Sequence, residues 1–199
     1  MLRKIILAAV AASPLLFAVT AADAAGLAGF ARNLNNNAGV QYIKAKARVL
    51  APFAHVKFCK SNPGECAAGS GPATIDFSAV RQSELRRVNA TVNRSIRPVN
   101  DRSGAGGDVW RINASSGDCE EYALTKRSRL IALGWSPRAL RVAVAYTPSG
   151  EGHAVLVVKT SKGDMVLDNR TSAIKNWRQA NLRWVKIQSG DNPRQWFSL

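Results

Sequence analysis

The chain has 199 residues and carries 28 lysines and arginines against 13 aspartates and glutamates, a formal net charge of +15. This length allows one well-buried domain and excludes two of ordinary size. The charge favours an anionic partner, such as an envelope polymer, a lipid headgroup or an acidic protein. Nucleic acid is not expected as a partner, because the basic residues are scattered and no recognition motif is present.

The first 24 residues have the pattern of a secretory signal peptide. Arg3 and Lys4 form a charged start, residues 5–19 are apolar, and Ala22-Asp23-Ala24 places small residues before a cleavage site at Ala25. The apolar run is shorter than the roughly 20 residues of a membrane-spanning helix, and no later stretch approaches that length. We therefore expect a periplasmic or secreted protein with no stable membrane span after signal removal. An uncleaved anchor is the alternative.

Two segments without clear periodicity follow the leader. Residues 25–50 are rich in Asn and Ala and then basic, and we expect a loosely ordered N-terminal arm. Residues 51–75 are rich in Gly, Pro and Ser and are predicted to be a loop. One folded domain is accordingly expected over residues 51–199.

The predicted loop contains two of the three cysteines. Cys59 and Cys66 enclose Asn62-Pro63-Gly64, a turn that can bring the two Cα atoms within disulfide range. An exported protein meets an oxidising compartment, so we predict a Cys59–Cys66 disulfide. A zinc site at these cysteines is not expected, because further ligands are missing nearby. Cys119 is then the odd thiol of the chain.

Two helices are predicted in the middle of the chain. The first runs from about Ser78 to Ser95. The second begins after Asp118, carries Glu120 and Glu121 in its first turn, and ends at Gly134. The apolar residues that recur at helix spacing in the first are Val80, Leu85, Val88, Val92 and Ile96.

Strands are predicted after the second helix, which indicates an α+β fold: helices followed by an antiparallel β-sheet. Alternating and β-branched residues mark these segments. They are Leu140 to Tyr146, His153 to Lys159, Met165 to Asn169, Leu182 to Gln188, and a short one at Trp196-Phe197.

The predicted hairpin brings a histidine and an aspartate together. A turn at Thr160 to Gly163 pairs Lys159 with Asp164, which sets Asp168 opposite Val155 and diagonal to His153. Diagonal Cβ atoms on one sheet face are roughly 7–8 Å apart, a distance that these two side chains can bridge. A register slip of one residue would put Asp168 on the wrong face.

Cys119 lies where a helix start favours a thiolate. We predict Cys119 as a nucleophile, His153 as its general base and Asp168 as the group that orients the imidazole. The Cys119 N–H is a natural oxyanion donor, and Trp110 and Asn113 are candidates for the second. Taken singly, a buried cysteine, a half-exposed histidine and an aspartate in a strand-end turn also have ordinary structural roles.

Several blocks of the chain match a known family. They are residues 88–96 with Asp101, Asp108-Val109-Trp110, residues 117–123 with Lys126, residues 153–156 and residues 166–169. Through them, residues from about 85 to 188 resemble the bacterial transglutaminase-like cysteine peptidases. The resemblance implies a papain-like, transglutaminase-like core with Cys119, His153 and Asp168 as its triad.

The family includes a periplasmic calcium-dependent protease that releases a large surface adhesin. The resemblance implies that Asp118, Glu120 and Glu121 take part in calcium binding, and oxygen ligands suit this ion. Helix capping and compensation of the helix dipole are the alternative role of these acids. The chain has Glu121 where the family often has Asp, and residues 111–116 lack the Pro-Glu element of the adhesin-cleaving branch.

The sequence thus predicts an exported cysteine peptidase that hydrolyses a peptide or amide bond through a thioester at Cys119. We expect an envelope or surface protein as its substrate. No cofactor is expected to be required for the chemistry itself. One alternative is a transglutaminase or other acyltransferase that uses the same triad, and another is a non-catalytic basic protein that binds the envelope.

Overall fold

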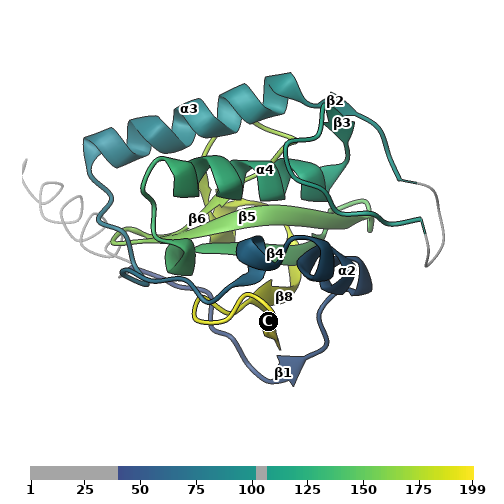
Figure 1. The fold of residues 1–199 in the computed structure, drawn as a ribbon. Coiled ribbons are helices and arrows are strands. Elements are labelled where there is room, and N and C mark those ends of the chain that lie inside the picture. Colours follow the sequence, from purple (N-terminus) through teal and green to yellow (C-terminus); the bar gives the residue numbers. More distant parts are fainter. Residues whose placement is uncertain (1–39, 102–106) are drawn as a thin grey trace, which may run out of the picture. The chain divides into compact units, whose positions relative to one another are not determined.

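A computed structural model describes residues 40–101 and 107–199 (Figure 1). The predicted signal peptide and residues 25–39 of the predicted arm lie outside the described residues. The described part belongs to one compact unit, Val40–Leu199. No helix within it combines the length and the hydropathy that crossing a bilayer requires.

A seven-stranded sheet forms the centre of this unit, in the order β1-β9-β8-β4-β5-β6-β7, and each neighbouring pair is antiparallel. Its strands are β1 (Arg48–Val49), β4 (Leu140–Tyr146), β5 (Gly152–Thr160), β6 (Gly163–Leu167), β7 (Lys175–Asn176), β8 (Arg183–Gln188) and β9 (Trp196–Ser198). Two short strands, β2 (Arg97–Pro98) and β3 (Ser116–Gly117), form a separate parallel pair. The predicted α+β fold is confirmed.

Three α-helices accompany the sheet: α2 (Phe53–Ser61), α3 (Ala79–Ser95) and α4 (Cys119–Ala132). In Figure 1, α4 lies along β5 and α3 lies on the outer side of α4. Both predicted helices are therefore confirmed, and α4 begins at Cys119 as expected. Gly134, which was predicted to end the second helix, has a positive φ of 80°, a conformation that favours glycine.

The buried face of α3 is almost the predicted one. Leu85, Val88, Val92 and Ile96 are buried and share a core with α4 and β5. Val80, the fifth apolar residue at helix spacing, is 68% exposed. Val80 lies in the first turn of α3, and the core contacts begin one turn later, at Leu85.

Residues 40–50 are not a loose arm, because they contact the far end of the chain. Arg48 and Val49 form β1, which pairs with β9, and the Ile43 N–H donates to a buried Asp164 carboxylate oxygen at 2.6 Å. The folded unit thus starts before the predicted boundary at residue 51. These partners are more than a hundred residues away in sequence, where local pattern carries no signal.

The predicted loop at 51–75 contains the helix α2, so that part of the prediction was wrong. The glycines and prolines that suggested a loop follow the helix, except for Pro52, which precedes it. Ala54 and Phe58 of α2 pack in one cluster with Trp110 and Trp196. Tertiary packing therefore supports a helix whose own periodicity is weak.

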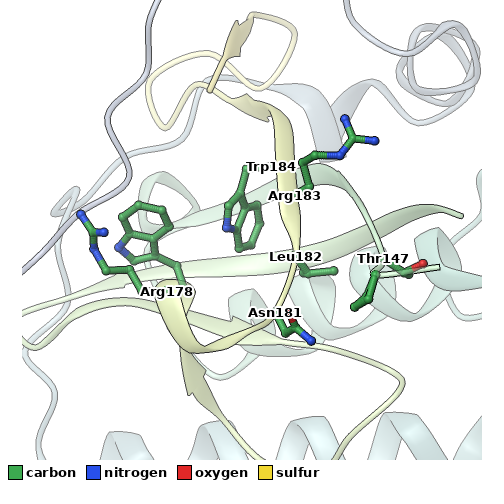
Figure 2. Close-up of a pocket in the computed structure, with 8 residues that line it drawn as sticks. Thr147, Arg178, Asn181, Leu182, Arg183 and Trp184 are labelled. Carbon is green, nitrogen blue, oxygen red and sulfur yellow. The ribbon is translucent and has the colours of Figure 1, made fainter. Parts of the chain in front are cut away.

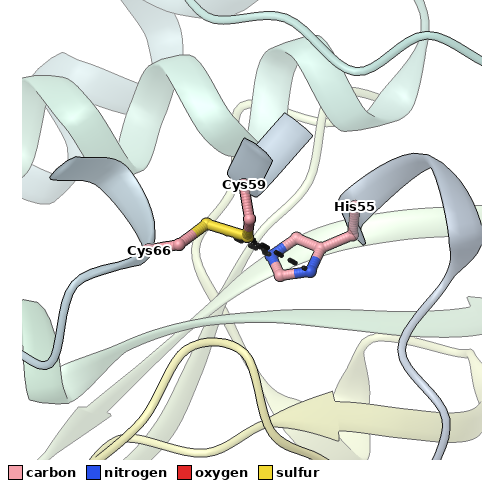
Figure 3. A group of neighbouring side chains, drawn as sticks. All are labelled: His55, Cys59 and Cys66. Atoms are coloured by element: carbon pink, nitrogen blue, oxygen red, sulfur yellow. Dashed lines mark hydrogen bonds between the residues drawn. A yellow bond between two sulfur atoms is a disulfide. The ribbon is translucent and has the colours of Figure 1, made fainter. Parts of the chain in front are cut away.

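The Cys59–Cys66 disulfide is present, with the two Cα atoms 5.5 Å apart. The imidazole of His55 lies beside the two sulfur atoms (Figure 3). Burial, and then the charge of Arg127, lower the pKa of His55 to about 4. The Trp196 indole N–H donates to Nδ1 of His55 at 3.3 Å. His55 is therefore a neutral packing residue.

The β5–β6 hairpin has the predicted register. Lys159 pairs with Asp164 and Leu156 with Leu167, around the turn at Ser161-Lys162. Continuing this register by one residue places Asp168 beside Val155 at the end of β6. The strand pairing therefore places Asp168 next to the start of β5, where His153 lies.

We predict that Leu85→Ala lowers the free energy of unfolding by about 2–5 kcal/mol, because it leaves a cavity in a closed core. Val80→Ala, on the same helix but exposed, should change it by less than about 0.5 kcal/mol. Urea denaturation followed by circular dichroism measures both. Equal effects of the two changes would contradict the observed face of α3.

Candidate active site

The start of α4 is held by a buried carboxylate. Glu121 has no exposed surface; its Oε2 accepts from the Asp118 N–H and its Oε1 from the Arg111 N–H, each at 3.0 Å. Gly117 lies against this side chain, and a Cβ at position 117 would come within 2.6 Å of the Glu121 Cγ. The hydrogen bonds to Glu121 and its contact with Gly117 thus hold the residues just before Cys119 in place.

His153 and Asp168 are joined by a hydrogen bond. His153 Nε2 and Asp168 Oδ1 are 2.9 Å apart, and both side chains are almost fully buried. Because Nε2 faces the carboxylate, Nδ1 is the ring nitrogen that remains for another partner. The predicted diagonal pair on the hairpin is therefore present.

Arg170 is a part of this arrangement that the sequence pattern did not reveal. Its Nη2 donates to Asp168 Oδ2 at 2.8 Å and its backbone N–H to Oδ1 at 2.9 Å. Burial alone would raise the pKa of Asp168, but the hydrogen bonds from His153 and Arg170 outweigh burial and hold this pKa well below its usual range. Asp168 is therefore ionised at neutral pH.

The helix face below Cys119 carries a buried lysine. Lys126 is fully buried on α4, and its Nζ lies 5.8 Å from the centroid of the Tyr122 ring. Burial lowers the pKa of Lys126 to about 7, although the charge of Asp168 opposes this shift. Lys126 belongs to the blocks that match the family, but the sequence assigns it no role in the site.

Cys119 and His153 line the same two hollows. One, of about 320 Å³, is also bordered by Arg170; the other, of about 510 Å³, is also bordered by Trp110 and Ala154. Ala154 follows His153 on β5 and borders the larger hollow together with the Cys119 thiol. A free thiol and an imidazole that is hydrogen-bonded to a buried carboxylate thus border the same hollows.

The thiol of Cys119 faces carboxyl groups. Its Sγ donates to Glu120 Oε2 at 2.8 Å. Burial, followed by the charge and hydrogen bond of Glu120, raises the pKa of Cys119 far above its usual value. In this arrangement the thiol is protonated, and a thiolate requires that the nearby negative charge be offset.

The structure separates the two candidates for the second oxyanion donor. The buried Trp110 indole N–H has no hydrogen-bond partner among the described residues, and Trp110 lines a hollow together with Cys119. Asn113 lines neither hollow, and its backbone N–H donates to Thr125 Oγ1. A donor without a partner beside the thiol keeps Trp110 as the candidate.

Three carboxyl groups crowd together next to Cys119. Side-chain oxygens of Asp118 and Glu120 lie within 4.8 Å of each other and of the sulfur, and Asp108 also approaches Glu120. Burial, then hydrogen bonding to Asp118 and the charge of Asp118, raise the pKa of Glu120 to about 9. One buried oxygen of Asp118 and one of Asp108 have no hydrogen-bond partner among the described residues.

These observations fit a hard cation such as Ca²⁺. Crowded carboxylate oxygens without donors are the ligands that this ion prefers. Glu121, expected among the ligands, is instead engaged with backbone N–H groups. Asp108 joins the cluster in its place. A lone aspartate eleven residues before Cys119 forms no sequence pattern that predicts a metal ligand.

Comparison with known proteins agrees with this geometry. The family model described as bacterial transglutaminase-like cysteine proteinase, BTLCP, matches residues 45–199. The chain belongs to this family. It is therefore a transglutaminase-like cysteine peptidase, a hydrolase.

Solved structures of Legionella pneumophila LapG resemble the chain. The calcium-bound form is 22% identical over 61% of this chain and 71% of that one, with a TM-score of 0.50. A second LapG structure and an EGTA-treated one are each 23% identical over 61% of this chain and 69% of that chain, with TM-scores of 0.49. The likeness to the calcium-bound form supports the transglutaminase-like fold. Among curated protein sequences, none matches this chain.

We predict that Gly117→Ala lowers the free energy of unfolding by about 1–3 kcal/mol, because the new methyl group overlaps buried Glu121. Gly64→Ala is the matched control, since a Cβ there would meet nothing within 4 Å. Thermal or urea unfolding measures both variants. A neutral Gly117→Ala would contradict the tight contact before Cys119.

Proposed function

We propose that Cys119, His153 and Asp168 form the triad of an exported peptidase, which hydrolyses a peptide bond of an envelope or surface protein through a thioester. The observation that carries this proposal is the hydrogen bond between His153 and Asp168 at a hollow that the free thiol of Cys119 also lines. An imidazole held by a buried, ionised carboxylate is what activation of a thiol needs.

The proposed reaction begins with transfer of the Cys119 proton to Nδ1 of His153. The sulfur then attacks the carbonyl carbon, and the C–N bond breaks as the imidazolium gives its proton to the leaving amine. Water next attacks the thioester, losing a proton to His153 and releasing the acid, while the thiol is restored. The Cys119 N–H and the Trp110 indole N–H would stabilise the oxyanion in both halves.

Asp168 and Arg170 keep the histidine in place in this scheme. The carboxylate accepts from Nε2 of His153, which leaves Nδ1 free to take the thiol proton, and it stabilises the imidazolium. Arg170 holds the carboxylate from its other oxygen. Asp168 is therefore held by His153 on one oxygen and by Arg170 on the other, which fixes the plane of the His153 ring before substrate binds.

Asp108, Asp118 and Glu120 are the residues that would hold Ca²⁺. A bound ion would supply positive charge beside a thiol that these acids otherwise keep protonated. The bound calcium named for a Legionella LapG structure supports this assignment.

The leader pattern and the family support export and the class of substrate. A periplasmic or secreted peptidase would meet envelope and surface proteins, of which a surface adhesin is one candidate. Acyl transfer to an amine would use the same thioester. An assay with a millimolar primary amine distinguishes the two reactions. Incorporation of the amine into the acyl product would indicate acyl transfer, and release of the free acid would indicate hydrolysis.

With Ca²⁺ present to offset the nearby acids, we predict that a thiol-directed probe labels Cys119 faster than a model thiol, and that His153→Ala slows labelling by about 100-fold or more. Asp168→Asn should also slow it, because the amide cannot stabilise the imidazolium. Mass spectrometry of the mature protein follows the rates, and Cys119→Ala shows the background. Labelling no faster than the model thiol, unchanged in His153→Ala, would refute the proposed triad.

We also predict that Ca²⁺ stabilises the protein. At 100 times its dissociation constant the ion should add about 2.7 kcal/mol, equivalent to about 5–10 °C in melting temperature. Glu120→Gln and Asp108→Asn should lose most of this shift, whereas Asp76→Asn, an exposed acid elsewhere, should keep it. Differential scanning fluorimetry with Ca²⁺ or a chelator measures the shift, and its absence in the unsubstituted protein would exclude calcium binding.

A further inference from the structure

A third surface hollow, which Cys119 does not border, has an unusual lining. It has a volume of about 550 Å³ and is bordered by Thr147, Pro148, Trp177, Arg178, Asn181, Leu182, Arg183 and Trp184. Figure 2 shows Arg183 and Trp184 leaving β8 on opposite sides, with Arg178 beyond the Trp184 ring. No acidic residue is part of the lining. We call this site the basic-aromatic hollow.

Both of its arginines stack on aromatic rings. The Arg178 Cζ lies 4.7 Å from the centroid of the Trp177 ring, and the Arg183 Cζ lies 4.3 Å from that of Tyr146. Stacking occupies the faces of a guanidinium and leaves the N–H groups at its edges available. Neither arginine forms an ion pair with an acid of residues 40–101 or 107–199.

The tryptophans add flat apolar surface next to these donors. The rings of Trp177 and Trp184 meet edge to face, with centroids 6.4 Å apart. An occupant that supplies both apolar contact and negative charge would satisfy this lining. Carboxylates fit the arginines particularly well, because a guanidinium can bind them with two parallel hydrogen bonds.

The basic-aromatic hollow continues toward Cys119. Thr147 borders both this hollow and the smaller one beside the thiol, and Tyr146, on which Arg183 stacks, borders the larger one. Thr147 is therefore common to the walls of the basic-aromatic hollow and of the smaller hollow beside the thiol. A chain bound next to Cys119 can extend into the basic-aromatic hollow without leaving the surface.

The strand register gives the distance between the basic-aromatic hollow and His153. Trp184 on β8 is opposite Ala145 on β4, and Ala145 is opposite His153 on β5. Two strand spacings amount to about 10 Å between the backbones of Trp184 and His153. An extended peptide covers that distance in about three residues.

We propose that the basic-aromatic hollow binds an acidic segment of the protein substrate, about three residues from the bond that is cleaved. This assignment rests on the proposed peptidase function. A peptide accounts for the lining better than a membrane does, because Thr147 joins the hollow to the smaller hollow beside Cys119. The segment supplies carboxylates to Arg178 and Arg183 and packs its side chains on Trp177 and Trp184.

The test measures binding of two fluorescent eight-residue peptides to the mature protein by anisotropy. One peptide carries four glutamates, and the other has glutamines in the same positions. We expect the acidic peptide to bind at least tenfold more tightly. Arg178→Ala/Arg183→Ala should reduce its affinity at least tenfold. Arg86→Ala/Arg87→Ala removes the same charge from the exposed side of α3 and should reduce it less than twofold.

The acidic peptide should also protect the thiol. Eight extended residues reach about 26 Å, so a chain seated in the hollow can cover Cys119. We expect saturating acidic peptide to slow alkylation of Cys119 several-fold, and the glutamine peptide to leave the rate unchanged. Binding without protection would place the occupant away from the cleaved segment and overturn the proposal.

Other outcomes would also overturn it. An equal loss of affinity in both double variants would mean that the peptide responds to net charge alone. Binding to phosphatidylglycerol vesicles that Arg178→Ala/Arg183→Ala abolishes, without binding of the acidic peptide, would assign the surface to lipid. Alkylation of Cys119 without peptide reports on the proposed triad separately, because neither double variant touches the thiol, and its rate should match that of the unsubstituted protein.

Discussion

The packing of α4 against β5 is the contact on which the site depends. Tyr122 and Ala123 on the helix share a core with Leu156 on the strand, so the start of the helix is held against the start of the strand. Cys119 and His153 occupy those two starts. A shift of one residue along the helix would move the thiol by 1.5 Å and turn it by about 100°, away from the imidazole. Burial of apolar surface thereby fixes the geometry for chemistry.

Two carboxyl groups whose pKa values are shifted in opposite directions determine the charges near the contact between α4 and β5. Asp168 is buried but surrounded by donors, and its pKa is lowered. Glu120 is buried among other acids, and its pKa is raised to about 9. The first arrangement prepares a general base, whereas the second keeps the adjacent thiol protonated. Switching between an unreactive and a reactive thiol would require a change of charge at the second arrangement, where one oxygen of Asp108 and one of Asp118 lack a donor among the described residues.

Most of the fold between residues 78 and 198 could be predicted from local pattern. The helix α4, the strand β4 and the pairing of Lys159 with Asp164 depend on periodicity and turn residues, which neighbouring positions encode. The helix α2 and the strand β1 could not be predicted, because their partners are Trp196 and β9 at the other end of the chain. In the site, the pair of His153 and Asp168 followed from hairpin register, but Arg170 and Asp108 followed from no spacing rule.

The sequence by itself determined that Cys119 starts a helix and that a hairpin joins His153 to Asp168, because both features arise within about fifteen residues of chain. Only the tertiary structure decided what surrounds them. The burial of Cys119 and Glu120, the approach of Asp108 to Glu120 and the hydrogen bond from the Arg111 N–H to Glu121 all depend on contacts between separate segments of the chain. Desolvation sets the charge of each group, and it exists only once the elements have packed.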